Sequence, residues 1–464
     1  MERRYNFRGS KQRKFRFGGV LPIIIIGILT GLLGFFYFSS YIEFDEPSIK
    51  MNSTGVWNRQ SSLIINLEDK TSGIKSYKVA FIDNGVENMI FDNTLTASQK
   101  SIALEVKPEL IKPKSNTIKL VVTVFDNAKW NYFGNESKQE FDLMIDDEKP
   151  QIKMLSQSFG IKKGGSAIFV ANITDRNLKE ANIIINNKYK FAFIPFYKQG
   201  NFVAFATWPV SEKNLLDVKI EAIDRAGNIS QNKLFLNQKH SNFNIDKITV
   251  DDNFINSSLQ KMEDIKKIKF TNTTEAFLYF NKTTREQNIA SLQMLSQKMD
   301  KTFQQNFSLE PFNPLLSSKL LGDFGDWRIY LKDEKIIDEQ WHLGIDLASV
   351  KNAPIYSSNN GKVAFVGNLG IYGKAIIIDH GFGIMSLYAH TSQADIKVGQ
   401  NVAIGQKIAN TGMSGAVLGD HLHFGILING IESDPKEWLD SNWIKNEILK
   451  AIEIAKSKID GKNL

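Results

Sequence analysis

Two stretches of alternating apolar and polar residues recur at a fixed offset in the first half of this chain. Residues 46–51 read Glu-Pro-Ser-Ile-Lys-Met and residues 149–154 read Lys-Pro-Gln-Ile-Lys-Met, an offset of 103 (149 minus 46). Successive side chains of a strand point to opposite faces, so period-two alternation between turn signals predicts half-buried strands. We therefore expect two β-sandwiches of about 100 residues each, at 44–145 and 146–245.

The strands of the two predicted sandwiches correspond in order. Each has an early alternating strand and a late strand that ends in an aspartate turn, at Asp126 in the first and Asp224 in the second. The early strands carry Leu63, Ile65 and Leu67, and Phe169, Ala171 and Ile173. This pattern resembles bacterial immunoglobulin-like repeats. Such repeats act as spacers, or they bind cell wall or a partner protein, and the sequence leaves both roles open.

The N-terminus predicts a membrane anchor. Residues 1–19 form a basic tail, and residues 20–41 are an uncharged run of apolar or small residues. About 20 such residues span a bilayer as a helix, and the basic residues before them hold the N-terminus in the cytoplasm. The alternative is a cleaved signal peptide, whose apolar region would be shorter and end in a small-residue cleavage site. Under either interpretation, the residues after about 42 are exported.

Charge and cysteine content exclude two classes of site. Most of the formal charge of +7 comes from the basic residues of the tail, so it indicates no nucleic-acid-binding face. The chain has no cysteine, which removes disulfides and thiolate metal sites together. Any metal must therefore be bound through histidine and carboxylate.

The second half of the chain predicts a helical segment, a β-rich domain and a terminal helix. Residues 253–267 and 284–307 carry apolar residues at helical spacing, with a polar segment at 271–274 between them. Residues 246–320 are thus either a linker or an arm that covers a catalytic groove. Glycine-punctuated short strands predict a compact β domain over 321–440, and a helix follows within 441–464. The predicted fold class is mainly β.

Five of the six histidines lie between His342 and His423. Residues i and i+2 of a strand share a face, so His421 and His423 project together while Leu422 enters the core. Two imidazoles this close are mutually unfavourable when both are protonated. A metal ion avoids this, and so does a division of roles in which one histidine is a metal ligand and the other a base. Gly344 allows a tight backbone path, so that His342 and Asp346 can converge on the same ion.

A His, Asp, His ligand set leaves one open position on a tetrahedral zinc ion, which is typical of catalytic sites. Zinc-bound water can act as a nucleophile near neutral pH. Hydrolysis also needs groups that move protons, and His390 and His421 are the candidates. His380 follows a core strand and precedes a glycine turn, which favours a structural role.

These motifs resemble the lysostaphin/LytM-type zinc metalloendopeptidases, which cleave peptide cross-links of bacterial peptidoglycan. The resemblance rests on His342-x-x-x-Asp346, Tyr388-Ala389-His390 and His421-Leu422-His423, within a match over about 320–440. It implies a β-rich domain with a groove and a Zn²⁺ ion on His342, Asp346 and His423. It also implies that His390 and His421 activate water and stabilise the oxyanion.

The resemblance implies an endopeptidase that hydrolyses peptidoglycan stem peptides or cross-links, with the D-Ala–meso-diaminopimelate bond as the expected target. Together with the anchor, it implies a single-pass protein of the inner membrane with a periplasmic catalytic domain and a role in cell-wall remodelling. Peptidoglycan, the inner membrane and other cell-wall enzymes are the expected partners, and nucleic acid is not. The alternatives are a non-catalytic envelope regulator that activates a cell-wall amidase, and a structural envelope protein.

Overall fold

The computed structural model describes residues 20–38, 43–129, 134–263, 265–299, 301–302 and 306–462, so the predicted basic tail lies outside the described residues. The chain divides into two compact units. The first comprises the N-terminal residues to 148 together with 225–227, and the second comprises 149–224 and 228 to the C-terminus. Both units consist mainly of β-sheets, as predicted.

Helix α1 (Val20–Phe38) forms over most of the N-terminal apolar run. Among the side chains of α1 that the structure describes, Ile23, Leu29 and Leu33 are exposed. In the described part of the chain, no helix has the length and apolar character needed to cross a membrane. The transmembrane helix over 20–41 stays a prediction from the sequence.

The first predicted sandwich has two sheets that enclose one core. One sheet has the order β1 (Ser48–Met51), β3 (Leu63–Glu68), β6 (Ser101–Val106). The other has the order β2 (Val56–Trp57), β8 (Glu136–Ile145), β7 (Thr117–Asp126), β4 (Ile74–Asp83), β5 (Val86–Gln99). The short helix η1 (Pro108–Leu110) follows β6. Alternate residues of β3 and β7 are buried in this core, as the period-two pattern predicts.

The second predicted sandwich also has two main sheets. One has the order β14 (Ile194–Pro195), β15 (Asn201–Thr207), β11 (Ser166–Thr174), β9 (Gln151–Gln157). The other has the order β13 (Tyr189–Ala192), β12 (Leu178–Ile185), β16 (Val218–Asp224), β17 (Ile229–Lys233). A short parallel pair, β10 (Gly160–Lys162) and β18 (Asn237–Lys239), lies beside them.

The C-terminal β domain is built on an eight-stranded sheet. Its order is β20 (Lys319–Gly322), β23 (Ile345–Ala348), β31 (Leu422–Ile428), β27 (Ile384–Ala389), β26 (Lys374–Asp379), β25 (Gly361–Asn368), β29 (Asn401–Val402), with β32 (Ile431–Ser433) beside β31. A small sheet has the order β24 (Pro354–Tyr356), β30 (Lys407–Asn410), β28 (Gln393–Ala394). The predicted strands at 375–379 and 384–388 are confirmed as the antiparallel neighbours β26 and β27.

The predicted helical segment starts with a strand and then forms three helices. Strand β19 (Ile245–Thr249) pairs in parallel with β21 (Trp327–Lys332), which pairs with β22 (Lys335–Trp341). Then follow α2 (Asp252–Lys261), α3 (Thr273–Leu278), the π-helical turn η2 (Tyr279–Thr284) and α4 (Arg285–Gln297). The predicted bounds were partly wrong, because α3 begins within the polar segment at 271–274 and α4 ends ten residues before 307.

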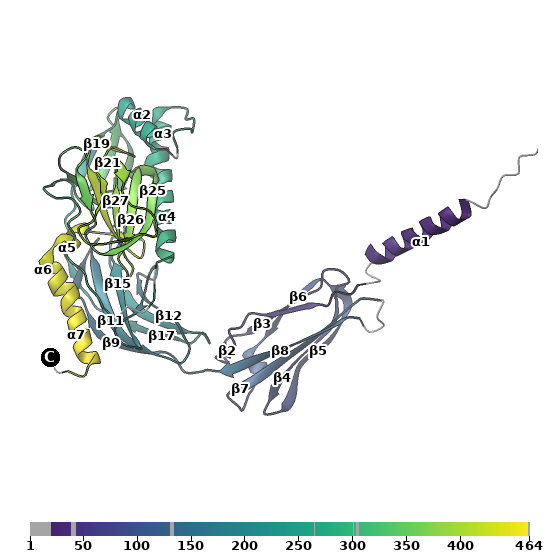
Figure 1. The fold of residues 1–464 in the computed structure, drawn as a ribbon. Helices are drawn as coiled ribbons and strands as arrows, with labels where there is room; N and C mark the ends of the chain where they lie inside the picture. The colour runs from purple at the N-terminus through teal and green to yellow at the C-terminus, as the bar shows by residue number, and fades with distance from the viewer. Residues whose placement is uncertain are drawn as a thin grey trace, which may run out of the picture. The chain divides into compact units, whose positions relative to one another are not determined.

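We call residues 245–297 the arm. Its helices α2, α3 and α4 lie against the C-terminal β domain in Figure 1. Phe277 and Phe280 share a small core with Tyr330 of β21. Leu292 of α4 packs with Ile377 of β26 in another core. The arm is therefore packed against the domain along its length.

One hydrophobic core joins the second sandwich to the C-terminal domain. It includes Phe205 of β15, Phe424 of β31 and Trp438. The region predicted as one terminal helix is helical but divided into four segments: α5 (Pro435–Leu439), α6 (Ser441–Trp443), the π-helical η4 (Ile444–Leu449) and α7 (Lys450–Ile459). Helix α7 lies along β9 and β11 (Figure 1). The second sandwich and the C-terminal domain are thus packed as one body.

Candidate metal centre

Three neighbouring strands, β23, β31 and β27, position most of the histidine cluster. Asp346 on β23 and His423 on β31 are register partners, and Ala389 at the end of β27 is the partner of His423 on its other side. His390 directly follows that alanine, and His342 directly follows β22. Residues far apart in the sequence meet because antiparallel pairing fixes which residues lie opposite each other.

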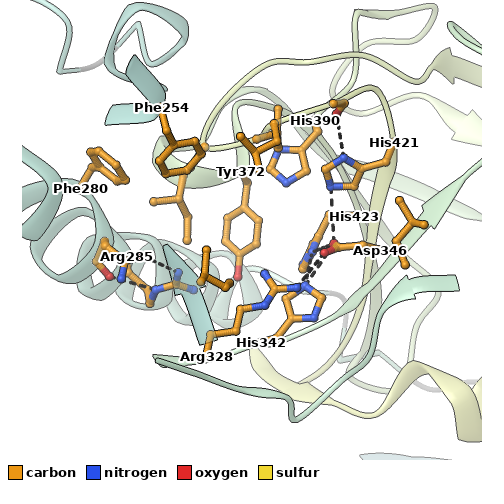
Figure 2. Close-up of a pocket in the computed structure, with 18 of the residues that line it drawn as sticks. Phe254, Phe280, Arg285, Arg328, His342, Asp346, Tyr372, His390, His421 and His423 are labelled. Atoms are coloured by element: carbon orange, nitrogen blue, oxygen red, sulfur yellow. Dashed lines mark hydrogen bonds and ion pairs between the residues drawn. The ribbon is translucent and has the colours of Figure 1, made fainter. Parts of the chain in front are cut away.

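His342, Asp346 and His423 place three potential ligand atoms within hydrogen-bonding distance of one another. Asp346 Oδ1 lies 3.1 Å from His342 Nε2 and 2.9 Å from His423 Nδ1, and the two nitrogens are 3.2 Å apart (Figure 2). All three residues belong to one group that could hold a metal ion. The two histidines are buried, with 5% and 4% of their surface exposed.

The hydrogen bonding of His342 is compatible with a cation at this position. Its Nδ1 lies 2.7 Å from the carbonyl oxygen of Asp323, which can only accept, so Nδ1 carries the proton and donates it. Its Nε2 then faces both the carboxylate oxygen of Asp346 and Nδ1 of His423. Ligand atoms that meet in a buried site are stabilised by a cation between them. A metal ion can contact all three.

The spacing of the three atoms suits zinc. Bonds of about 2.0–2.2 Å at tetrahedral angles would separate ligand atoms by roughly 3.4 Å, slightly more than the observed 2.9 to 3.2 Å. Two imidazole nitrogens and one carboxylate oxygen also form a typical donor set for catalytic zinc. The residues present therefore fit the ion, with a small outward movement of the side chains.

His390 and His421 stand beside the three ligands with their rings 4.9 Å apart. Their Nδ1 atoms each lie 2.9 Å from a backbone carbonyl oxygen, of Ser414 and Gly419 respectively. Both therefore donate from Nδ1 and keep Nε2 for other partners. His421 Nε2 lies 3.6 Å from Asp346 Oδ1, so it faces the metal centre.

The surroundings shift the pKa values of this cluster in opposite directions. Burial lowers the pKa of His390 well below its ordinary value, and the neighbouring imidazoles of His421 and His423 lower it further. Burial also lowers the pKa of His421, but the Asp346 carboxylate outweighs it and leaves that pKa raised. Burial raises the pKa of Asp346, yet the histidines around it bring it well below its usual range.

Two neighbouring residues, Arg328 and Gly344, hold the ligands in place. Arg328 Nη2 donates to Asp346 Oδ2 at 3.0 Å and leaves Oδ1 to the metal centre. At Gly344, a Cβ atom would lie 2.4 Å from His423 Nε2. The absence of a side chain at this position therefore lets His423 approach, which is the local reason for a glycine between His342 and Asp346.

The metal centre lies in a cavity of about 310 Å³ whose other wall is the arm. Phe254, Phe280 and Arg285 of the arm line it together with the ligands (Figure 2). Lys261 at the end of α2 donates to the carbonyl of Val417 at 3.0 Å, in the loop that leads to His421. The arm thus covers the groove in this structure.

The five predicted site residues are brought together, and His380 is not among them. His380 Nδ1 and Nε2 each lie 2.7 Å from a partner, the carbonyl of Asn360 and the hydroxyl of Ser386. Sequence reasoning missed Arg285, Asn281 and Tyr372, which also line the cavity. No motif marks them, although Arg285 lies at the start of the predicted helical run at 284–307.

Comparison with known proteins identifies the C-terminal domain. Residues 340–435 match Peptidase family M23, so the chain carries a metallopeptidase domain of this family. The peptidoglycan DD-endopeptidase ShyA of Vibrio cholerae is 37% identical over 89 residues, covering 19% of this chain and 21% of ShyA.

Two further relatives are named for different functions. The DD-carboxypeptidase/endopeptidase Mpg of Neisseria meningitidis is 34% identical over 129 residues, covering 28% of each chain. The murein hydrolase activator NlpD of Salmonella typhimurium is 36% identical over 119 residues, covering 24% of this chain and 31% of NlpD. The chain thus spans less than a third of each of these relatives, and the matches concern the peptidase domain.

Proposed function

We propose that this chain is a zinc-dependent endopeptidase that hydrolyses peptide bonds in peptidoglycan stem peptides or cross-links. The single observation that carries the proposal is the convergence of buried His342 Nε2, Asp346 Oδ1 and His423 Nδ1 within 3.2 Å of one another. A metal ion is the partner that these three atoms share. The match to a metallopeptidase family over the same residues supports it.

The geometry supports a proposed role for each of the five residues. His342, Asp346 and His423 hold the ion, which when bound supplies a Lewis acid and lowers the pKa of a water molecule. His390 and His421 present Nε2 to the same cavity, so one accepts the proton of the attacking water and the other donates to the developing oxyanion. The water oxygen bonds to the carbonyl carbon, the C–N bond breaks, and the accepted proton passes to the leaving amine.

Peptidoglycan is the proposed substrate because ShyA is named a peptidoglycan DD-endopeptidase, and Mpg is named a DD-carboxypeptidase/endopeptidase. The D-Ala–meso-diaminopimelate bond is the proposed target within it. The sequence of residues 20–41 supports a further proposal, that the protein is held at the inner membrane with its catalytic domain in the periplasm. Cell-wall remodelling at that surface is the proposed role.

A non-catalytic regulator is the second candidate, because NlpD is named as a murein hydrolase activator. The complete set of ligand and proton-transfer residues around one cavity favours the enzyme. A regulator needs the fold and its surface but not a metal-binding triad.

Digestion of purified sacculi tests the proposal. We expect the protein without residues 1–41 to release un-cross-linked peptides, and a chelator to stop it. His423→Ala and His390→Ala are expected to reduce cleavage by at least about a thousandfold, because the first removes a metal ligand and the second a group that transfers protons or stabilises the oxyanion. His240→Ala, an exposed histidine outside the cavity, is the matched control and is expected to cleave as the parent does.

Two outcomes would contradict the enzyme. Cleavage that survives the chelator or the loss of His423 would overturn the metal mechanism. Absence of cleavage, combined with stimulation of an added amidase, would favour the regulator.

A further inference from the structure

Arg285 brings a second cationic group into the cavity, from a part of the chain outside the family match. It is the first residue of α4 and lines the cavity with the metal ligands (Figure 2). Among the described residues no ion pair of Arg285 is found, whereas Arg328 is paired with Asp346 at 3.0 Å. Arg285 is therefore a cavity cation that the proposed mechanism does not use.

The guanidinium of Arg285 is oriented by one neighbour. Its Nε and Nη2 donate to the backbone carbonyl and the side-chain oxygen of Asn281, both at 3.0 Å. Asn281 is buried and donates in turn to Asp338 Oδ2 at 2.8 Å. A guanidinium has five N–H donors, so three remain for another partner. The group is held along one edge and open on the rest.

The helix that carries Arg285 is fixed against the domain. The backbone N–H of Ile371 donates to Asn288 Oδ1 of α4 at 3.2 Å. At Gly370, a Cβ atom would lie 2.4 Å from Thr284 Cγ2, so the helix contacts this turn directly. Asn281 also lies in the π-helical turn η2, a kind of turn that often occurs at functional sites. Arg285 therefore has a defined place relative to the metal centre.

Among the described residues, no acid forms an ion pair with this cation. Burial raises the pKa of Glu432 to about 7, although the nearby charge of Arg285 lowers it. The arginine is half-buried, and Phe254, Phe280 and Tyr372 line the cavity together with charged residues that include Asp346 and Asp420. A partly desolvated guanidinium that forms no ion pair within the described chain is stabilised when an anion from outside the chain binds it.

We propose that Arg285 binds a carboxylate of the peptide substrate and makes the enzyme selective for free acids over amides. This inference rests on the proposed function. Stem peptides carry free carboxylates on diaminopimelate and on the terminal D-alanine, and arginine matches a carboxylate through two parallel N–H donors. Asn281 is the positioning residue that sets the angle of the guanidinium.

The test uses cross-linked stem-peptide dimers in three forms: the free acid, the diaminopimelate amide and the terminal D-alanine amide. We expect the zinc-loaded protein without residues 1–41 to show a KM about tenfold to a hundredfold higher for one amide than for the free acid. That amide identifies the carboxylate that is bound. Arg285→Gln should raise KM for the free acid by a similar factor, change kcat little, and abolish the preference. Arg285→Lys, which keeps the charge, should restore part of it.

Lys282→Gln is the matched control, because Lys282 is an exposed cation one turn earlier in the arm. Equal KM increases for the free acid in Arg285→Gln and Lys282→Gln would overturn the inference. It would also be overturned if Arg285→Gln raised KM equally for all three peptides. Thermal unfolding of each variant shows whether a change in KM comes from misfolding. If Arg285→Gln is misfolded, the KM values of Arg285→Lys decide whether the inference holds.

Binding measured by calorimetry separates this inference from the proposed function. If the protein cleaves none of the peptides but binds the free acid more tightly, and Arg285→Gln removes that difference, the carboxylate site stands and the enzyme proposal fails. If the protein cleaves the peptides and Arg285→Gln has no effect on KM, the enzyme proposal stands and the inference fails.

Discussion

Backbone carbonyls determine the chemistry of the histidines in this site. The Nδ1 atoms of His342, His390 and His421 all donate to main-chain oxygens, which leaves each Nε2 directed into one cavity. The partner of a histidine's second nitrogen fixes its tautomer and orientation. The sequence predicted which residues gather, but the carbonyl partners come from loops whose paths no motif specifies.

Gly344→Ala tests how closely the ligands are packed. The new Cβ atom would lie 2.4 Å from His423 Nε2 and 2.7 Å from the backbone oxygen of Phe424, so a ligand strand must shift. We expect zinc affinity to fall about tenfold to a hundredfold, as measured by competition with a chelator of known affinity. Gly419→Ala is the control, because nothing lies within 4 Å of its Cβ position. Equal zinc affinity in the two variants would contradict this account of Gly344.

At the scale of elements, the strands were easier to predict than the arm. The alternations at Leu63 to Leu67 and at Ile118 to Val124 are buried on alternate residues in β3 and β7, because a half-buried strand imposes period two. Helical spacing in the arm indicates an apolar face but not the surface that the face covers. Strand β19 was missed, because its partner β21 lies some 80 residues further along the chain.

The hairpin of β31 and β32 carries an acid that makes stability depend on pH. Burial raises the pKa of Glu432 from 4.5 to about 7. An acid with a higher pKa in the folded state stabilises the fold at low pH, and this contribution is lost as the pH rises from about 4.5 through 7. We expect Glu432 to lower the free energy of unfolding by up to about 3 kcal/mol over that range.

Glu432→Gln should therefore be more stable than the parent at pH 8 and about equally stable at pH 5. Denaturant unfolding at the two pH values, at constant zinc concentration, measures the difference. Glu453→Gln, an exposed glutamate of α7, is the control and should follow the parent at both pH values. A constant difference between Glu432→Gln and the parent would show that Glu432 does not titrate in this range.

At the scale of the whole molecule, the second sandwich is more than a spacer preceding the peptidase domain. Phe205 of β15 packs against Trp438 of α5 with ring centroids 5.9 Å apart, and Ser166 contacts Ser433 through their hydroxyls at 2.6 Å. Lys162 also pairs with Asp434 at 2.7 Å. Removal of this sandwich would expose apolar surface of a shared core, which strongly destabilises a domain.

Truncation tests this interdependence. We expect a chain that begins at residue 149 to unfold as a single cooperative unit, and a chain that begins at residue 246 to unfold at least about 10 °C lower or to aggregate. Differential scanning calorimetry measures both. Unfolding of the two chains at the same temperature would show that the peptidase domain is stable without the second sandwich.

We propose that one metal ion on His342, Asp346 and His423 makes this chain a peptidase, and a zinc titration measures whether it does. The protein without residues 1–41 is stripped of metal, zinc is added back stepwise, and the new amino groups released from sacculi are counted. We predict no release without metal and full release at one equivalent of zinc, with His423→Ala inactive throughout. Release by the stripped protein, or a response to zinc that is unchanged in His423→Ala, would contradict the account.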